Sequence, residues 1–461
     1  MAVLAGHRFV SIAAAAAAVL FAIGPVNGGE ASGGLTVSGP IDETLQDELR
    51  FRHDFGLMTD VAAVRELMAD PTADTTYGAA LTVGETREMD RRVAMESQMT
   101  PLEEAAEKLP GFAGHWIDQP AGGILMVAFT GDASIHEAVL RPLVPPGATM
   151  RLVSARYTSA ELDALAEEIF ADRHALEQSG VKVSLLYAHL QTNQVVVGVR
   201  DLTSASTALL EQRYGQAVST IYSDPVPTAC TNNNTNCWGP PLRAGVSGFP
   251  VGWGGWCSIA FLVRHNSSGN RGWLTAGHCA TLTGIGSVWH HAANSAWPMG
   301  TIMQTCYPQC YYSDSGRADI CCFSLISRIV YDQNYPAGRE VSYAQYLDAD
   351  DIGDIVCLNA RRSLSWRCGN IQAIGYWQYP DGTWFLQQRF ANYANKTGDS
   401  GGAVHSAKLP PSNRVIAYGV ESGCTAISGD TCVGWGIYSH IYHASLDMGV
   451  TVCSVVNPCP Q

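Results

Sequence analysis

The first half of this chain contains no cysteine. All 14 cysteines lie between Cys230 and Cys459, so the residues before them can form no disulfide. The first half is also poor in positive charge, because residues 1–228 hold 15 Lys and Arg against 29 Asp and Glu, whereas the remainder holds 13 of each. Such a contrast predicts separate domains, and 461 residues allow two or three. The balanced charge of the second half gives no sign of nucleic-acid or membrane steering.

The chain also lacks a second long apolar run. The one run, Phe9–Ile23, contains six consecutive alanines, follows Arg8 and precedes the small residues around Gly28. This pattern predicts a secretory signal at residues 1–28 that is removed, with a signal anchor as the alternative. Export to an oxidising, extracellular compartment and an even number of cysteines then predict disulfides rather than a metal site.

Residues 29–228 show mixed helical and strand patterns, which predict an α+β domain. Helical spacing is found at 60–68 and 82–99, and Thr158 with Glu161 forms a capping-box pattern before the amphipathic run 162–176. Strands are predicted at 123–130 and 150–157, and a hairpin at 181–190 and 194–199. The domain shows no pair of nucleophile and base.

Long helical periodicity is almost absent after residue 244. A Pro-, Asn- and Thr-rich segment at 223–242 predicts an exposed linker, and the following region has recurrent glycines, short strand patterns and nine of the 11 tryptophans. This texture predicts an all-β sandwich or barrel that is braced by disulfides.

Two short segments of this second part carry chemistry. One is Thr275-Ala276-Gly277-His278-Cys279 and the other is Gly398-Asp399-Ser400-Gly401-Gly402. A serine hydroxyl becomes a good nucleophile when a base removes its proton, and the pKa of histidine suits that task. The glycines allow a sharp turn in which the N–H groups of Gly398 and Ser400 stabilise an oxyanion.

A triad requires a third member, a carboxylate that orients the histidine. The best candidate is Asp319, because it precedes the apolar run 320–326, so that its backbone enters a core strand while its side chain faces a cleft. Asp314, in a polar turn, and Asp332, in a polar loop, are rivals. The predicted order is therefore His278, Asp319, Ser400.

These segments resemble the histidine and serine motifs of chymotrypsin-fold serine proteases, and in particular the bacterial branch of streptogrisins and α-lytic protease. The resemblance covers residues 242–450. It implies two antiparallel six-stranded β-barrels with the triad between them, a Cys257–Cys279 disulfide that braces the histidine loop, and a second disulfide between Cys357 and Cys368.

The same resemblance implies a preproenzyme with a signal peptide at 1–28, an α+β pro-region at 29–228 and a protease domain at 229–461. The pro-region would assist folding and inhibit the enzyme until it is cleaved, with release between Tyr222 and Cys230. No activation sequence of the animal trypsin type precedes the histidine motif, so an internal arginine, Arg361 or Arg362, is expected to pair with Asp399. The alternative is that both arginines are solvated.

Substrate binding is expected on the segment that contains Glu421, Ser422 and Gly423, which resembles the edge strand of this family. Ala394 stands where trypsin-like enzymes carry an aspartate, which argues against an ordinary trypsin pocket, and Lys396 is close enough in sequence to neutralise Glu421. The expected partners are protein or peptide substrates and the chain's own pro-region, for a monomer with no cofactor, metal, nucleic acid or membrane.

The same residues allow other interpretations. Gly-Asp-Ser-Gly-Gly also fits the nucleophile elbow of an esterase, although that elbow leads into a helix and its histidine follows the serine. A catalytically dead protease-fold binding protein is the non-enzymatic alternative. His290-His291 gives a weak metal signal, because adjacent strand residues point to opposite faces. Of the remaining cysteines, Cys321 and Cys322 are expected to pair with Cys306 and Cys310, one each. Short loops predict the further pairs Cys424–Cys432, Cys453–Cys459 and Cys230–Cys237.

Overall fold

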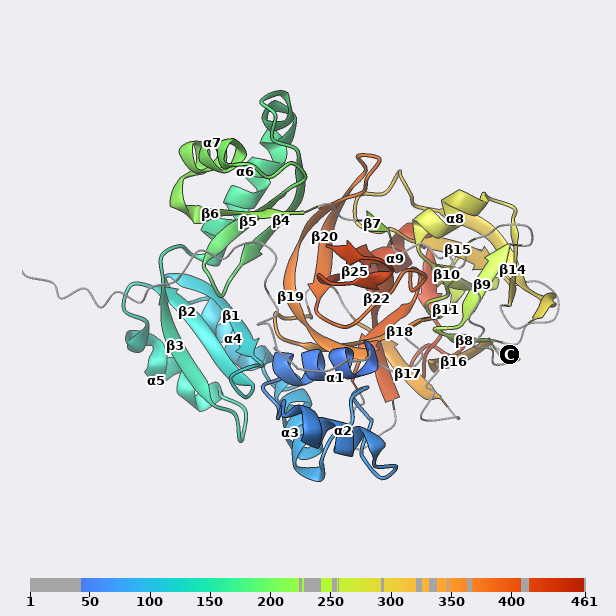
Figure 1. The fold of residues 1–461 in the computed structure, drawn as a ribbon, viewed down its shortest axis with the longest axis horizontal. Coiled ribbons are helices and arrows are strands. Elements are labelled where there is room, and N and C mark those ends of the chain that lie inside the picture. The colour runs from blue at the N-terminus through green and yellow to red at the C-terminus, as the bar shows by residue number, and fades with distance from the viewer. Residues whose placement is uncertain are drawn as a thin grey trace, which may run out of the picture.

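The structure is a computed structural model that describes residues 43–223, 226–227, 242–250, 255, 257–291, 294–320, 326–330, 338–345, 347, 349–362, 367–407 and 414–459. We refer to residues 43–223 as the N-terminal region and to residues 242–459 as the C-terminal region. Figure 1 shows the first, in blue to green, beside the second, in yellow to red. The predicted signal and most of the predicted linker lie outside the described residues.

The N-terminal region is α+β, as the sequence predicts. A sheet β1-β2-β3 is covered by helices, and a second group of strands, β4 to β6, packs against α6 and α7. The bounds are α1 Glu43–Asp54, α2 Val61–Ala69, α3 Val83–Glu96, α4 Thr100–Glu107, β1 Phe112–Asp118, β2 Ile124–Thr130, α5 Glu137–Leu140, β3 Met150–Ala155, α6 Ser159–Gln178, β4 Val183–His189, β5 Gln194–Val199, α7 Ser204–Tyr214 and β6 Val218–Tyr222.

Side-chain caps explain where these helices begin. The Thr158 hydroxyl accepts from the N–H of Glu161 at 3.2 Å, and the Glu161 carboxylate accepts from the N–H of Thr158 at 2.8 Å. The predicted capping box is therefore confirmed as the start of α6. Thr82 and Glu85 form the same motif at the start of α3, and the carboxylate of Asp60 caps α2.

The C-terminal region is mostly β, and α8 and α9 are its helices among the described residues. The bounds are β8 Leu242–Ala244, β9 Ser247–Pro250, β10 Cys257–Ser258, β11 Leu262–His265, β12 Arg271–Thr275, α8 Gly277–Thr283, β13 Val288–His291, β14 Asn294–Thr305, β15 Gly316–Asp319, β16 Ile326–Val330, β17 Arg339–Ala344, β18 Ile355–Asn359, β19 Arg367–Gln378, β20 Trp384–Ala391, β21 Ala403–Ser406, β22 Arg414–Cys424, β23 Ile427–Ser428, β24 Thr431–Cys432, β25 Gly436–His440, α9 Ile441–Met448 and β26 Val450–Val452.

Two large sheets divide these strands. Among the described residues, one sheet has eight strands in the order β10-β9-β13-β14-β15-β12-β11-β26. The other has 13 strands, of which β4 to β6 come from the N-terminal region and β7, Val226–Pro227, from the segment between the two regions. Six strands per barrel are therefore not confirmed, although a β-rich fold in separate sheets is.

The two regions share backbone hydrogen bonds. The predicted hairpin is formed by β4 and β5, with Asn193 in the left-handed conformation at φ 54° in its turn. The outer side of β4 pairs antiparallel with Gly375–Trp377 of β19, so that a sheet of the C-terminal region continues into the N-terminal region. Figure 1 shows β4 beside the long β19–β20 hairpin. A cavity of about 910 Å³ lies nearby, lined by residues of both regions.

Five disulfides are formed among the described cysteines. Cys257–Cys279 and Cys357–Cys368 are present as the resemblance implies, and Cys424–Cys432 and Cys453–Cys459 confirm two further predicted pairs. The expectation that Cys306 and Cys310 pair with Cys321 and Cys322 is wrong. Cys306 and Cys310 are bonded to each other, because one turn of chain, with a hydrogen bond from the N–H of Cys310 to the carbonyl of Cys306, brings them together. Cys230, Cys237, Cys321 and Cys322 lie outside the described residues.

The hydrophobic core of the C-terminal region reaches the histidine segment. Trp273 and Trp289 are fully buried with ring centroids 5.2 Å apart, and Ala276 and Cys279 belong to the same cluster. This packing fixes the backbone on both sides of His278. In the described part of the chain, no helix combines the length and apolar character needed to cross a membrane.

Candidate active site

His278 is the second residue of α8, directly after β12. Its side chain is 3% exposed, and the neighbouring Cys279 is tied to β10 by the disulfide to Cys257. Gly277 precedes it because a Cβ atom there would lie 2.8 Å from an oxygen of Asp314. The turn from strand to helix is therefore fixed by core packing, a disulfide and a close approach that requires glycine.

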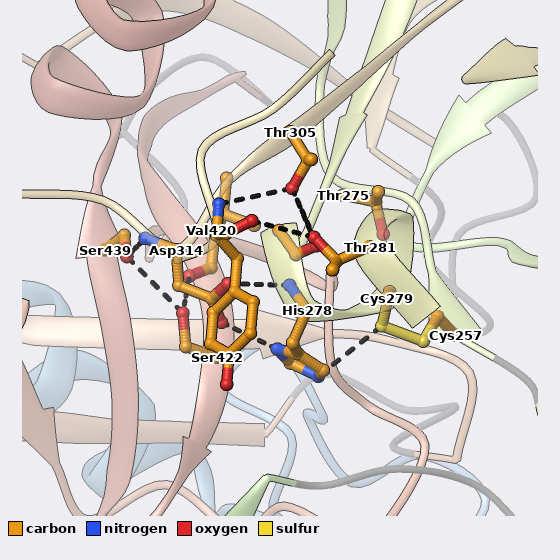
Figure 2. A network of polar contacts seen from close by, with 12 residues as sticks. Cys257, Thr275, His278, Cys279, Thr281, Thr305, Asp314, Val420, Ser422 and Ser439 are labelled. Carbon is orange, nitrogen blue, oxygen red and sulfur yellow. Dashed lines mark hydrogen bonds and ion pairs between the residues drawn. A yellow bond between two sulfur atoms is a disulfide. The ribbon is translucent and has the colours of Figure 1, made fainter. Parts of the chain in front are cut away.

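Asp314 binds this histidine through both carboxylate oxygens. Oδ2 lies 2.7 Å from Nδ1 of His278, and Oδ1 accepts from the backbone N–H of His278 at 2.8 Å. Asp314 is fully buried, and its own N–H donates to the hydroxyl of Ser439 at 2.9 Å. Figure 2 shows the carboxylate between His278 and Ser439. The pair of contacts fixes both the ring and the backbone of the histidine.

The prediction that Asp319 orients His278 is therefore wrong. Asp319 ends β15, and its carboxylate pairs with the guanidinium of Arg317 and accepts from the amide of Asn270 at 2.9 Å. The physical reason is the position of the strand: β15 covers 316–319, ahead of the apolar run in which a strand was expected to begin. The turn that faces His278 thus contains Asp314. The third candidate, Asp332, lies outside the described residues.

Further side chains support the pair. Thr305 donates through its hydroxyl to the carbonyl of Gly277 at 2.9 Å, and Ser439 donates to the side-chain oxygen of Gln388 at 2.9 Å. The ring of Tyr379 packs 5.3 Å from that of His278, centroid to centroid. These contacts leave the Asp314–His278 pair in a dry environment, where charge-assisted hydrogen bonds are strong.

Ser400 lies in the sharp turn before β21. Gly398 has φ 102° and Gly401 has φ 82°, conformations that glycine adopts without strain. The carbonyl of Ser400 accepts from the N–H of Ser258 at 2.7 Å, and the carbonyl of Ser258 accepts from the hydroxyl of Thr275 at 2.8 Å. The serine turn is thereby fastened to the strand that leads into His278.

The carboxylate of Asp399 is held by backbone N–H groups at this turn. It accepts from Arg362 at 2.7 Å and from Lys396 at 2.9 Å. The guanidinium of Arg362 pairs instead with Asp430 at 2.5 Å, so the contact of Arg362 with Asp399 that the structure shows is made by its main chain. Arg361 is buried, and its N–H donates to the hydroxyl of Ser258 at 2.9 Å. Neither arginine is simply a solvated surface charge.

The predicted substrate-binding residues lie near the end of β22. Glu421 and Ser422 are fully buried, and the Ser422 hydroxyl lies 3.4 Å from that of Ser439, which links this strand to Asp314. Gly423 pairs with Pro227 of β7 in an antiparallel register. Figure 2 shows Ser422 and Val420 beside the Asp314–His278 pair.

The carboxyl group of Glu421 faces the protein interior. Tyr393 and Asn395 donate to its two oxygens, and burial raises the pKa of this carboxyl well above its ordinary value. A fully buried carboxyl group whose two oxygens are already bonded to Tyr393 and Asn395 is not accessible to a basic substrate side chain. Glu421 is therefore a structural partner of Tyr393 and Asn395, and this arrangement does not favour basic specificity.

Other histidines make different contacts. Nε2 of His440 lies 3.2 Å from the side-chain oxygen of Gln345, and Nε2 of His443 lies 3.0 Å from that of Gln387. His290 and His291 lie on β13, and neither belongs to a group of three metal-ligand side chains in the part of the chain that the structure describes. His278 is therefore the histidine whose ring contacts a carboxylate, that of Asp314, close to the serine turn.

Sequence reasoning missed the residues that connect the site. Ser439 lies 125 positions from Asp314, and Ser258 lies 140 positions from Gly398, whose carbonyl accepts from its hydroxyl at 3.1 Å. Serines at these separations carry no local pattern. Only the pairing of distant strands brings them to the site.

Comparisons with solved structures find bacterial serine proteases. Nocardiopsis protease is 22% identical with a TM-score of 0.36, and the match covers 46% of this chain and 99% of that one. Thermobifida fusca protease A is 24% identical with a TM-score of 0.36, covering 46% and 98%. A serine protease described as specific for glutamic acid, with a histidine triad in substrate binding, is 24% identical with a TM-score of 0.37, covering 46% and 100%. At these values the likenesses assign no activity to this chain. No family model and no curated protein matches the sequence.

Proposed function

We propose that the C-terminal region is a serine endopeptidase with Ser400 as nucleophile, His278 as general base and Asp314 as the residue that orients the base. The observation that carries the proposal is the 2.7 Å contact between Nδ1 of His278 and the buried carboxylate of Asp314. This contact fixes the tautomer in which Nε2 carries the lone pair that accepts a proton, and it stabilises the imidazolium that forms.

The chemistry follows from these positions. Ser400 attacks the carbonyl carbon of the peptide bond while its proton passes to Nε2 of His278. The tetrahedral oxyanion is stabilised by the N–H groups of Gly398 and Ser400, each worth on the order of 3 kcal/mol. His278 then protonates the leaving amine. Water next attacks the acyl carbon while its proton passes to His278, and His278 returns that proton to the oxygen of Ser400 as the acid leaves.

We propose further that the N-terminal region is a pro-region. Two strands support this role: β4 extends the sheet of the C-terminal region, and β7 pairs with Gly423 and Cys424, directly after Ser422. A chain segment at that position occupies the strand edge on which a substrate would lie. Release between Tyr222 and Cys230 would free this edge. Five disulfides among the described residues support the predicted extracellular destination.

Substitution of Ser400 by Ala tests the proposal. The wild-type chain, secreted and matured, is expected to hydrolyse peptide bonds and to be labelled at Ser400 by a fluorophosphonate probe. S400A should lose labelling completely and lose about 10⁴- to 10⁶-fold in kcat/KM. Mass spectrometry of both proteins shows whether a new amino terminus arises between residues 222 and 230. An unlabelled wild-type protein of native fold would contradict the proposal.

The esterase alternative is less well supported. Ser400 is followed by strand β21 rather than by a helix, and the histidine with a carboxylate partner precedes the serine. A peptide library compared with a panel of simple esters separates the two functions. A dead binding protein, in contrast, would keep its function in S400A.

A further inference from the structure

Three potential metal ligands meet where the two regions touch. Glu103 comes from α4, His115 from β1, and Asp351 from the loop before β18 in the C-terminal region. One ligand atom of each lies within 4.8 Å of the others. Nε2 of His115 is 3.0 Å from Oδ1 of Asp351 and 3.9 Å from Oε1 of Glu103.

Acidic side chains outnumber basic ones at this position. The side chains of Glu103 and His115 are 15% and 10% exposed. Oε1 of Glu103 is buried and has no hydrogen-bond partner among the described residues. The charged groups that act most strongly on Glu103 are Asp351, His115 and Glu107, of which only His115 can carry a positive charge. Two partly buried carboxylates and one imidazole, with ligand atoms within 4.8 Å of one another, form a donor set of the kind that a divalent transition ion accepts.

The spacing fits a small transition ion. Zn²⁺ binds nitrogen and carboxylate oxygen at about 2.0–2.2 Å with tetrahedral geometry, which places ligand atoms about 3.3 Å apart. The observed separations of 3.0 and 3.9 Å lie on either side of that value. Ca²⁺ takes six to eight oxygens, and Mg²⁺ prefers an octahedron of oxygens, so an imidazole with two carboxylates suits neither.

The backbone around the ligands is well fixed. The N–H of Ile117 donates to the carbonyl of Ile352 at 3.1 Å, and the amide of Gln119 donates to the carbonyl of Gly353 at 2.8 Å. Gly353 packs so tightly that a Cβ atom there would lie 2.7 Å from the carbonyl oxygen of Ile117. Asp351 is therefore held against β1 by three contacts of its two loop neighbours, Ile352 and Gly353, so little reorganisation is needed for it to bind an ion together with His115.

We propose that Glu103, His115 and Asp351 bind one divalent transition ion of the Zn²⁺ type, with water in the fourth position, and that this ion joins the N-terminal region to the C-terminal region. The ion replaces the His115–Asp351 hydrogen bond and places a positive charge between the two carboxylates. The site is separate from the catalytic residues, so it stands or falls independently of the proposed peptidase activity.

Zinc binding to the intact chain tests the proposal. The S400A protein is stripped with a chelator, and Zn²⁺ binding is measured by isothermal titration calorimetry and by metal analysis after dialysis. One ion per chain is expected, with a Tm that rises with free Zn²⁺. E103Q, H115Q and D351N should each weaken binding by more than about tenfold. Co²⁺ in place of Zn²⁺ should give the visible absorption of a tetrahedral site.

The matched control is His53, which is half exposed and has one carboxylate neighbour, Asp54, at 3.3 Å. H53Q should bind Zn²⁺ as S400A does. Circular dichroism and Tm in the presence of a chelator identify a variant that fails to fold, and E103Q and D351N remain as separate tests if H115Q does so. The proposal is overturned if the intact chain binds no stoichiometric Zn²⁺, or if binding is equal in E103Q, D351N and H53Q. A Tm that responds to pH but not to Zn²⁺ would mean that the carboxylates share a proton instead.

Discussion

Asp314 acts on His278 at two points, the ring and the peptide N–H. The ring contact selects one tautomer, and the backbone contact prevents the first turn of α8 from moving relative to the carboxylate. The backbone N–H of Asp314 donates to the hydroxyl of Ser439, and this contact also holds the carboxylate in position. Because Asp314 is fully buried, this geometry does not depend on solvent.

A comparison of two aspartates tests this assignment. D314N should lower kcat by about 10⁴-fold, because an amide stabilises the wrong tautomer and cannot support the imidazolium. D319N removes the partner of Arg317 and should leave kcat/KM within about threefold of the wild-type value, since it does not touch the histidine. Steady-state hydrolysis of one peptide by both variants, with Tm as the folding control, decides the matter. Equal losses would contradict the role of Asp314.

At the scale of single elements, the predictions that rest on local sequence patterns are the more accurate ones. Thr158 with Glu161 predicted the start of α6, and the glycines of the serine motif predicted a sharp turn, because each depends on neighbours within a few residues. The choice between Asp314 and Asp319 depended on where a four-residue strand begins. That position is fixed by pairing of β15 with β12 and β14, which no local pattern reveals.

The last helix, α9, shows how burial affects a titrating cap. His440 caps α9 by accepting from the N–H of Tyr442 at 3.1 Å, and its other nitrogen lies 3.2 Å from Gln345. Burial lowers the pKa of this histidine to about 3, with Asp350 opposing the shift and Arg389 and His443 adding to it. The neutral form is therefore the one that the fold requires.

Stability should consequently fall as the solution is acidified. The unfolded chain takes up a proton at His440 near the ordinary pKa of 6.5, whereas the folded chain does so near 3, so the contribution is present above pH 6.5 and lost as pH falls toward 3. H440N keeps a capping acceptor without titrating. Between pH 7 and pH 4 it should lose about 3 kcal/mol less stability than the parent S400A chain. Urea unfolding at both pH values measures this difference, and equal losses would refute it.

At the scale of the whole molecule, the two regions are joined by strands, ion pairs and aromatic rings. Besides the β4–β19 pairing, Phe170 of α6 stacks on Tyr376 with ring centroids 4.9 Å apart and lies edge-on to Trp384 at 5.2 Å. Composition predicted two regions, but it could not predict their contact. The partners lie roughly two hundred residues apart and follow no shared pattern.

Loss of Phe170 should loosen this junction. F170A removes two aromatic pairs and is expected to weaken the association of the cleaved N-terminal region about tenfold. If that region inhibits the peptidase, activity should appear earlier after cleavage in F170A than in the wild-type protein. E168A, an exposed position on the same helix, is the control. Size-exclusion chromatography with an activity time course measures both effects, and identical behaviour of F170A and E168A would count against the interface.

The pairing of β4 with β19 has a consequence for the mature protein after the N-terminal region is released. Gly375, Tyr376 and Trp377 would lose their strand partner while β20 stays on the other side, leaving an unsatisfied sheet border with two large aromatic rings. Such a border invites self-association. If the mature form does not aggregate, these three residues must be covered or the edge of β19 must be twisted out of reach. If it aggregates at high concentration, we expect these residues to form the contact.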